Sequence, residues 1–235
     1  PLEGHIGKGP LTVLDVGANT GTWTKAWLDA FGDRTTSVHM FEPHSRNVKE
    51  IRRRIAEGFF DEIGVGWASK LRIVPQAVGA KSARAPLRFG LAEARVSSLA
   101  QATSRLMGLE ASLGEVETVP VTTLDTYLAS VDLPHINVLR IGTEGFELPV
   151  LQGAAAALRS GRIGTILFEF GMHQLASRHT LEDFWTLLEP LEYRFHRFGL
   201  GRRGWGLTPI TEYRRGLEEL HTINVFMAQR PPRTT

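Results

Sequence analysis

The sequence has no cysteine among its 235 residues. This absence excludes disulfide scaffolds, zinc sites built from thiolates, and cysteine nucleophiles together. No apolar run approaches the ~20 residues that a membrane-spanning helix needs, and residues 1–10 lack the charged and then apolar pattern of a secretory signal. We therefore expect a cytoplasmic protein without a transmembrane segment.

The chain also has little net charge. Its 27 lysines and arginines against 25 aspartates and glutamates leave a formal charge of +2, which is too small to indicate a polyanionic partner. We interpret the arginines gathered towards the C-terminus as a solvated face around a loop, with an anion-binding patch as the less favoured alternative: Arg194, Arg197, Arg202, Arg203, Arg214 and Arg215. We expect no nucleic-acid partner.

The remaining composition describes a soluble globular protein, with 42% hydrophobic and 22% charged residues. One α/β domain with a substantial core fits this length, whereas two ordinary catalytic domains with linkers do not. No internal repeat or interdomain linker is visible in the sequence. We expect a single domain over residues 1–235 with its core over residues 12–228, and a homo-oligomer is an open alternative to a monomer.

Short apolar runs alternate with helical patterns along the chain. Buried strands are predicted at residues 12–16, 37–41, 72–76, 138–141 and 163–170. Helices are predicted from Thr180 onwards and at residues 23–31, 46–57 and 146–158. Short or edge strands are predicted at residues 85–91 and 117–122, and a closing antiparallel pair at residues 193–198 and 222–228. This order predicts a doubly wound, Rossmann-like α/β fold with a mostly parallel, seven-stranded sheet and an antiparallel strand pair at its C-terminal end.

A glycine-rich turn follows the first predicted strand. Gly17, Asn19 and Gly21 lie between that strand and the next helix, where a backbone must turn tightly and let a ligand come close. Asp15, at the end of the strand, can hold the turn or reach the amino acid portion of a bound cofactor. A strand-to-helix turn without a ligand is the simpler alternative. The position of the turn favours a ligand site.

Glu42 ends the second predicted strand, 21 positions after Gly21. An acid near this offset accepts hydrogen bonds from both ribose hydroxyls in such folds, although Glu42 could also be a helix-entry acid before Pro43. The turn lacks both the Gly-x-Gly-x-x-Gly spacing of pyrophosphate sites and a Gly-Lys-Ser or Gly-Lys-Thr phosphate loop. A nucleoside without phosphates therefore fits better than a nicotinamide dinucleotide or a nucleoside triphosphate.

Five segments resemble the FkbM family of methyltransferases: Val13–Gly21, Phe41–Pro43, Val78–Ala80, Thr123–Leu128 and Glu144–Glu147. The resemblance runs from about Thr12 to Ala228. It implies O-methylation of a hydroxyl, commonly on a saccharide or a polyketide-like natural product, with S-adenosylmethionine as cofactor and S-adenosylhomocysteine as product. It also implies that Gln76 and Ala77 lie beside the adenine. The cofactor-binding residues expected are Asp15, Gly17, Ala18, Asn19, Gly21, Glu42, Pro43, Gln76, Ala77 and Gly142.

One position departs from the family pattern. Gly142 stands where the family usually has an aspartate, at the carboxyl end of the fourth predicted parallel strand. That end faces the cofactor crevice in such a sheet, so the change removes a substrate, proton or metal contact. Engineered inactivation, natural decay, and replacement by another group are three explanations that the sequence leaves open.

A general base would assist methyl transfer to a hydroxyl. His173, just past the fifth parallel strand, has the side chain whose ordinary pKa best suits proton removal near neutrality. Glu144 and Glu169 are rival catalytic residues, although either could instead cap a helix or pair with an arginine. The eight histidines show no His-Glu-x-x-His or comparable spacing, so we expect no structural metal.

The sequence thus predicts an O-methyltransferase for a small-molecule or saccharide acceptor. A nucleic-acid methyltransferase is the first alternative, although no Asp-Pro-Pro-Tyr type of segment follows the fourth strand. A cofactor-binding protein with impaired catalysis is the second alternative, because of Gly142. We expect acceptor specificity to reside in residues 80–119 and 199–213, with Trp205 and residues 202–215 as a lid or acceptor wall.

Overall fold

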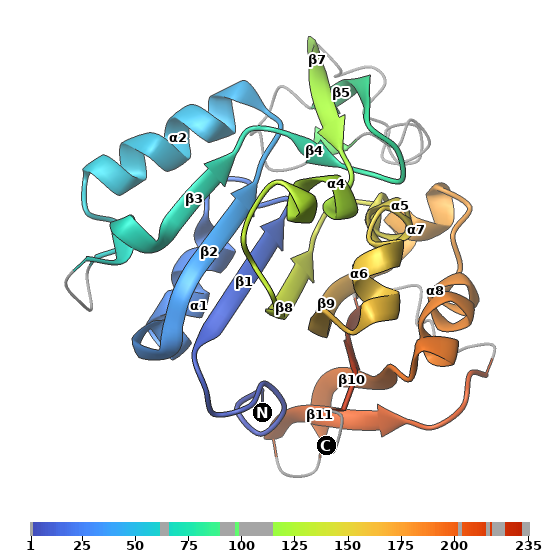
Figure 1. Ribbon diagram of the computed structural model, residues 1–235. Coiled ribbons are helices and arrows are strands. Elements are labelled where there is room, and N and C mark those ends of the chain that lie inside the picture. Colours follow the sequence, from blue (N-terminus) through green and yellow to red (C-terminus); the bar gives the residue numbers. More distant parts are fainter. Residues whose placement is uncertain are drawn as a thin grey trace.

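The computed structural model describes residues 2–61, 66–89, 97–98, 115–201, 204–214, 217 and 224–231. Its main sheet has eight strands in the order β11-β10-β12-β9-β8-β1-β2-β3 (Figure 1). Neighbours among β3, β2, β1, β8 and β9 pair in parallel, and β12, β10 and β11 continue the sheet in antiparallel pairs. The strands are β1 (Leu11–Val16), β2 (Thr35–Phe41), β3 (Leu71–Val74), β8 (Ile136–Ile141), β9 (Ile163–Phe170), β10 (Arg194–Gly201), β11 (Gly204–Ile210) and β12 (Asn224–Gln229).

The prediction of seven strands is wrong by one. The predicted closing pair is present as β10 and β12, but β11 adds an eighth strand outside β10, where Phe198 is opposite Leu207. Gly204 and Gly206 hide this strand in the sequence, because glycine lowers strand propensity and leaves no alternating side chains. Part of the predicted lid is therefore an edge strand, whereas its residues 202, 203 and 215 lie outside the described residues.

A second, four-stranded sheet has the order β4-β7-β5-β6. It contains the two segments predicted to be short or edge strands, and it lies at the end of the molecule towards which β1 and β2 point (Figure 1). Its strands are β4 (Ala77–Val78), β5 (Ala83–Phe89), β6 (Ser97–Ser98) and β7 (Glu115–Thr122). The small sheet therefore stands beside the carboxyl ends of the parallel strands.

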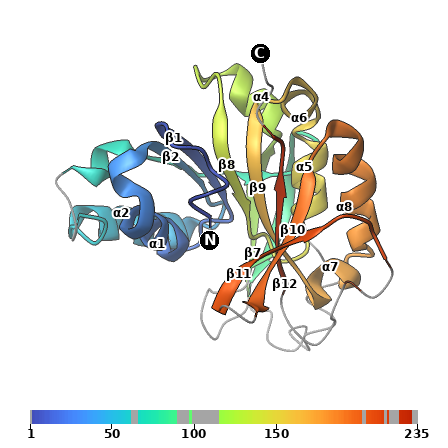
Figure 2. The ribbon, with the colours of Figure 1, turned by 90° about the horizontal axis from the view of Figure 1, so that it is seen from below.

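Helices cover both faces of the main sheet, as a doubly wound fold requires (Figure 2). One face carries α1 (Thr22–Phe31) and α2 (Ser45–Ala56). The other carries α4 (Leu124–Ala129), α5 (Glu147–Gln152), α6 (Ala155–Ser160), α7 (Met172–Ala176) and α8 (Leu181–Leu188). Within the described part of the chain, no helix combines the length and apolar character needed to cross a membrane.

The helix predicted at residues 146–158 is two helices, α5 and α6. The carbonyl of Gly153 accepts a hydrogen bond from the Asp125 N–H, and the Asp125 carboxylate accepts from the N–H groups of Ala156 and Ala157 at 2.8 and 2.9 Å. Asp125 thus satisfies the first turn of α6 from a different element. Propensity along residues 146–158 could not reveal this contact.

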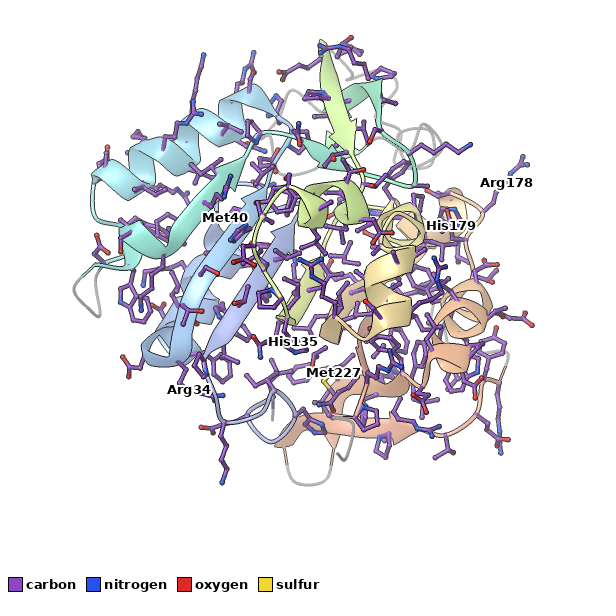
Figure 3. All side chains as sticks on the ribbon, viewed as in Figure 1. Arg34, Met40, His135, Arg178, His179 and Met227 are labelled. Carbon is purple, nitrogen blue, oxygen red and sulfur yellow. The ribbon has the colours of Figure 1, made fainter. Side chains whose placement is uncertain are left out.

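Each face of the sheet buries its own apolar core. Phe168, Phe184 and Phe226 belong to the core beneath α4–α8, whereas Met40 and Met227 belong to the core beneath α1 and α2 (Figure 3). The central parallel strands β1, β8 and β9 are mostly buried, and the last four residues of β2 are buried as well. The polar groups at their carboxyl ends are therefore held on a rigid support.

Candidate active site

The turn after β1 brings the backbone of the glycine-rich segment against the loop after β8. Gly17 has φ 82°, and a Cβ added to it would lie closer than 3.0 Å to the carbonyl oxygen of Gly142. The N–H of Gly142 donates to the carbonyl of Val16 at 2.9 Å. Both the backbone angle and the close contact require glycine at position 17.

The other members of the turn have different surroundings. Gly21, at φ 83°, packs against Phe60, whose ring would lie 2.7 Å from an added Cβ. Ala18 is buried in the apolar core beneath α1. The fully buried Asp15 carboxylate accepts from the Thr24 hydroxyl at 2.6 Å and from Arg140 Nη1 at 3.2 Å. Asp15, Ala18 and Gly21 were predicted to bind the cofactor, but they pack around the turn and are not among the residues that line the pocket.

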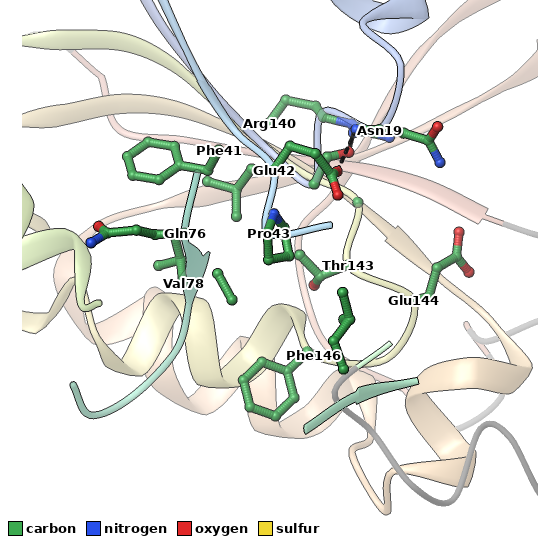
Figure 4. A pocket seen from close by; sticks show the side chains of 15 residues that line it. Asn19, Phe41, Glu42, Pro43, Gln76, Val78, Arg140, Thr143, Glu144 and Phe146 are labelled. Carbon is green, nitrogen blue, oxygen red and sulfur yellow. Dashed lines mark hydrogen bonds between the residues drawn. The ribbon is translucent and has the colours of Figure 1, made fainter. Parts of the chain in front are cut away.

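A pocket opens at the carboxyl ends of β1, β2 and β8 (Figure 4). Seven predicted cofactor residues line it: Gly17, Asn19, Glu42, Pro43, Gln76, Ala77 and Gly142. The predicted catalytic residue Glu144 lines it as well. The sequence interpretation missed the other lining residues, namely Val16, Phe41, Val78, Leu87, Arg140, Thr143 and Phe146. The second sheet contributes Val78 and Leu87, so both sheets build the pocket.

Glu42 is a buried carboxyl group in this pocket. Its oxygens accept hydrogen bonds from the N–H of Asn19 at 2.8 Å, the N–H of His44 at 2.9 Å and Asn47 Nδ2 at 3.3 Å. Burial raises the pKa of Glu42 to about 7, and these three donors lower it in part. A carboxylate offers about four lone-pair sites, so Glu42 can accept a further hydroxyl from a ligand.

Arg140 is the charged group that the sequence interpretation overlooked. Its Nη1 donates to the Gly17 carbonyl at 2.9 Å and to Asp15 at 3.2 Å, and its Nη2 lies 3.5 Å from Glu169 Oε1. A Cβ on Gly142 would lie closer than 3.0 Å to three atoms of this guanidinium group. The guanidinium group of Arg140 therefore occupies the space that a side chain at position 142 would fill. A charged residue within the apolar run at residues 138–141 was the signal that could have found it.

The structure brings two of the three predicted catalytic residues together. His173 Nδ1 and the Glu144 carboxylate form an ion pair, and Glu144 is the main cause of a raised pKa for His173. Glu144 has φ 52°, a backbone conformation uncommon outside glycine. The third predicted residue, Glu169, lies next to Arg140 instead.

A buried bridge formed by Glu147 and Gln174 connects the loop after β8, which carries Glu144, to α7, which carries His173. Glu147 accepts hydrogen bonds from the N–H groups of Thr143 and Gly145 at 2.8 and 3.0 Å, and from Gln174 Nε2 at 2.7 Å. Gln174 Oε1 in turn accepts from the Gly171 N–H at 2.6 Å. Both side chains are almost inaccessible to solvent. The loop after β8 and the loop after β9 are thereby fixed relative to each other.

Metal ligands are a separate question. Over the described ranges of the chain, no group of three or more histidine, aspartate or glutamate side chains is arranged to hold a metal ion. The Arg140 guanidinium already lies between two of the carboxylates at this end of the sheet, Asp15 and Glu169.

The mostly parallel, helix-covered sheet defines a Rossmann-like α/β protein, and the pocket lies at the carboxyl edge of the sheet, where such folds bind their ligands. The sequence profile described as the methyltransferase FkbM domain matches residues 15–195. The chain belongs to this family, and the resemblance seen in the sequence is confirmed. Its fold and family are those of a methyltransferase.

A solved structure of an FkbM methyltransferase has a similar fold. The FkbM methyltransferase from Methylobacillus flagellatus is 15% identical, with a TM-score of 0.55 over 93% of this chain and 43% of that one. This chain therefore spans less than half of that relative's length. Precorrin-6y C5,15-methyltransferase from Geobacter metallireducens is 10% identical, with a TM-score of 0.48 over 98% of this chain and 85% of that one. No curated protein sequence matches the chain.

Proposed function

We propose that the chain is an S-adenosylmethionine-dependent O-methyltransferase acting on a hydroxyl of a saccharide or natural-product small molecule. One arrangement carries the proposal: the glycine turn, Glu42 and Glu144 line a single pocket, and Glu144 is paired with His173. A nucleoside-binding half and a proton-accepting half are both needed for methyl transfer to a hydroxyl. This pocket has residues suited to each.

The residues present fit the cofactor. Phe41, Val78 and Phe146 offer apolar walls for an adenine ring, and Glu42 offers carboxylate oxygens for the ribose hydroxyls. At the other part of the pocket, Gly17 lets the turn after β1 lie directly against the loop after β8, and the Arg140 guanidinium covers Gly142. When bound, the cofactor supplies a methyl group on a positively charged sulfur. The carboxyl groups around the pocket favour such a cation.

His173 is the proposed general base. Its Nδ1 faces Glu144, so the carboxylate orients the imidazole ring and stabilises its charged form. Nε2 is then the ring nitrogen that accepts the acceptor's hydroxyl proton. Glu144 acts through His173 in this proposal. The buried Glu147–Gln174 bridge fixes the segments that carry Glu144 and His173 relative to each other.

The test begins with calorimetric titration of the chain with S-adenosylhomocysteine and S-adenosylmethionine. We expect binding in the micromolar range. Release of S-adenosylhomocysteine is then measured with saccharides, hydroxylated natural products and RNA as acceptors. Turnover with hydroxyl compounds supports the proposal, and turnover with RNA alone would make the chain a nucleic-acid methyltransferase. Absence of binding to both cofactor forms would overturn the proposal.

A second candidate function is cofactor binding without methyl transfer. The observation that favours it is the Arg140 guanidinium, which fills the space where the family usually has an aspartate side chain. Cofactor binding without turnover across the acceptor panel, by both the natural chain and Gly142→Asp, would favour this candidate. Turnover by the natural chain would eliminate it.

A further inference from the structure

Arg140 and Glu169 form a weak ion pair beside the pocket. They extend from neighbouring strands, β8 and β9, and their closest atoms, Nη2 and Oε1, are 3.5 Å apart. The side chains are 15% and 37% exposed, so the pair is open to solvent on one side. At this distance the hydrogen bond is at the limit of useful geometry. Little interaction energy is lost if a ligand separates the two groups.

The guanidinium of Arg140 has donors to spare. Nη1 is committed to Asp15 and to the Gly17 carbonyl. Of the five N–H groups of an arginine, the one on Nε and one on Nη2 have no acceptor among the residues that the structure describes. Asp15 is buried and anchors the group, so the spare donors have a fixed position at the pocket lining.

The charges around Arg140 indicate what kind of ligand group fits. A simple anion would meet Arg140 but would also face the Glu169 carboxylate, and a simple cation would face the guanidinium. A zwitterion satisfies both groups, since its carboxylate accepts from Arg140 and its ammonium donates to Glu169. Each new contact is charge-assisted and shorter than the pair it replaces.

We infer that Arg140 and Glu169 recognise an α-amino acid group, the one at the methionine end of the cofactor. This inference rests on the proposed function, because it needs the cofactor in this pocket. Glu42 lies on the other part of the lining, at the end of β2, where the ribose is proposed to bind. The two ends of the cofactor would thus meet two different charged sites.

Gly142 is part of the same recognition site. The guanidinium lies over it, and any side chain there would displace Arg140 from Asp15 and Gly17. The Trp23 ring, 5.7 Å from the guanidinium carbon, flanks the group as well. The glycine that departs from the family pattern therefore makes room for an arginine that binds the ligand.

The test compares two ligands that differ only at the amino acid end. S-adenosylhomocysteine carries the zwitterion, whereas 5′-methylthioadenosine lacks it. Both are titrated calorimetrically into the natural chain and into Glu169→Gln, Arg140→Lys and Glu182→Gln. Arg140→Lys keeps a positive charge near the buried Asp15, so the fold is retained. Glu182, in the first turn of α8, is the control for loss of a carboxylate away from the pocket.

We expect Glu169→Gln to weaken S-adenosylhomocysteine binding roughly tenfold, the loss of about one charge-assisted hydrogen bond. Binding of 5′-methylthioadenosine should change less than about twofold, because it makes no contact with Glu169. Arg140→Lys should show the same selectivity, and Glu182→Gln should change neither ligand. Equal weakening of both ligands, or no weakening in Glu169→Gln, would overturn the inference. Failure of the natural chain to bind either ligand would instead contradict the proposed function.

Discussion

Gly17 and Gly142 meet backbone to backbone, at the point where the turn after β1 reaches the loop after β8. Gly17→Ala would add both a left-handed backbone cost of ~1–2 kcal/mol and a steric overlap of ~1–3 kcal/mol. Gly58 is the matched control, since it has a similar φ of 74° but open space around an added Cβ. Chemical denaturation should show a loss for Gly17→Ala about twice that for Gly58→Ala. Equal losses would mean that the contact is easily relaxed.

The stability lost on substitution of Gly142 should depend on the charge of the new side chain. Gly142→Ala displaces the Arg140 head and leaves the buried Asp15 without its cation, at a cost of about 1–3 kcal/mol. Gly142→Asp also displaces the arginine but offers it a new carboxylate. The alanine variant should therefore unfold at lower denaturant concentration than the aspartate variant. The opposite order would show that Arg140 does not need the space above Gly142.

Cofactor binding should be coupled to the protonation of Glu42. With a pKa of about 7, this carboxyl is partly protonated at neutral pH. Ribose hydroxyls donate to the ionised form, so binding should release a fraction of a proton, and affinity should rise as pH increases through about 7. Calorimetry of S-adenosylhomocysteine binding in buffers of different ionisation enthalpy measures this release. Glu42→Gln should abolish it, and an unchanged release would assign the proton to another group.

The pairing of His173 with Glu144 should be visible in an NMR titration. The raised pKa of His173 should fall towards its ordinary value of 6.5 in Glu144→Gln. Because the pKa is raised in the folded state, the pair stabilises the protein below the unfolded pKa, and this contribution is lost as pH rises through the folded pKa. Glu144→Gln should therefore destabilise the protein more at about pH 6 than at about pH 9. A histidine pKa that does not move would contradict the pairing.

The contribution of the Glu147–Gln174 bridge to stability and to the position of His173 can be tested by substitution of Gln174. Gln174→Leu leaves Glu147 and the Gly171 N–H without their partner, which should cost about 1–3 kcal/mol of unfolding free energy per buried group. If the bridge also positions His173, the same variant should lower the pKa of His173 in the NMR titration. Ser177→Ala, which removes a hydroxyl bonded to the His173 carbonyl on the same short helix, is the control. A stability loss without any pKa change would limit Gln174 to a structural role.

Local patterns explain what could be predicted. The turn at Gly17 and the acid at Glu42 each follow directly on a buried strand, so their place at the carboxyl edge of the sheet followed from strand order alone. The antiparallel pair at the C-terminal end was predictable because two strand-like runs, at residues 193–198 and 222–228, are separated by a stretch rich in glycine and arginine. By contrast, β11 escaped because its glycines interrupt the alternation of side chains.

Contacts between distant segments explain what could not be predicted. Glu144 is on the loop after β8 and His173 is on α7, which follows β9, and the parallel pairing of β8 with β9 brings them together. The role of Arg140 depends on its side chain turning towards Asp15, which no spacing rule encodes. Asp15 itself was expected to hold the turn or reach the ligand, and in the structure its carboxylate accepts hydrogen bonds from Thr24 in α1 and from Arg140.

The Glu147–Gln174 bridge has a consequence for the exchange of loops between members of the family. One carboxyl group satisfies the backbone of the loop after β8 and, through a single amide, that of the loop after β9. A segment transplanted from another protein into either position alone would leave half of this buried arrangement unmatched. Residues 142–147 and 171–174 should therefore be exchanged as one unit.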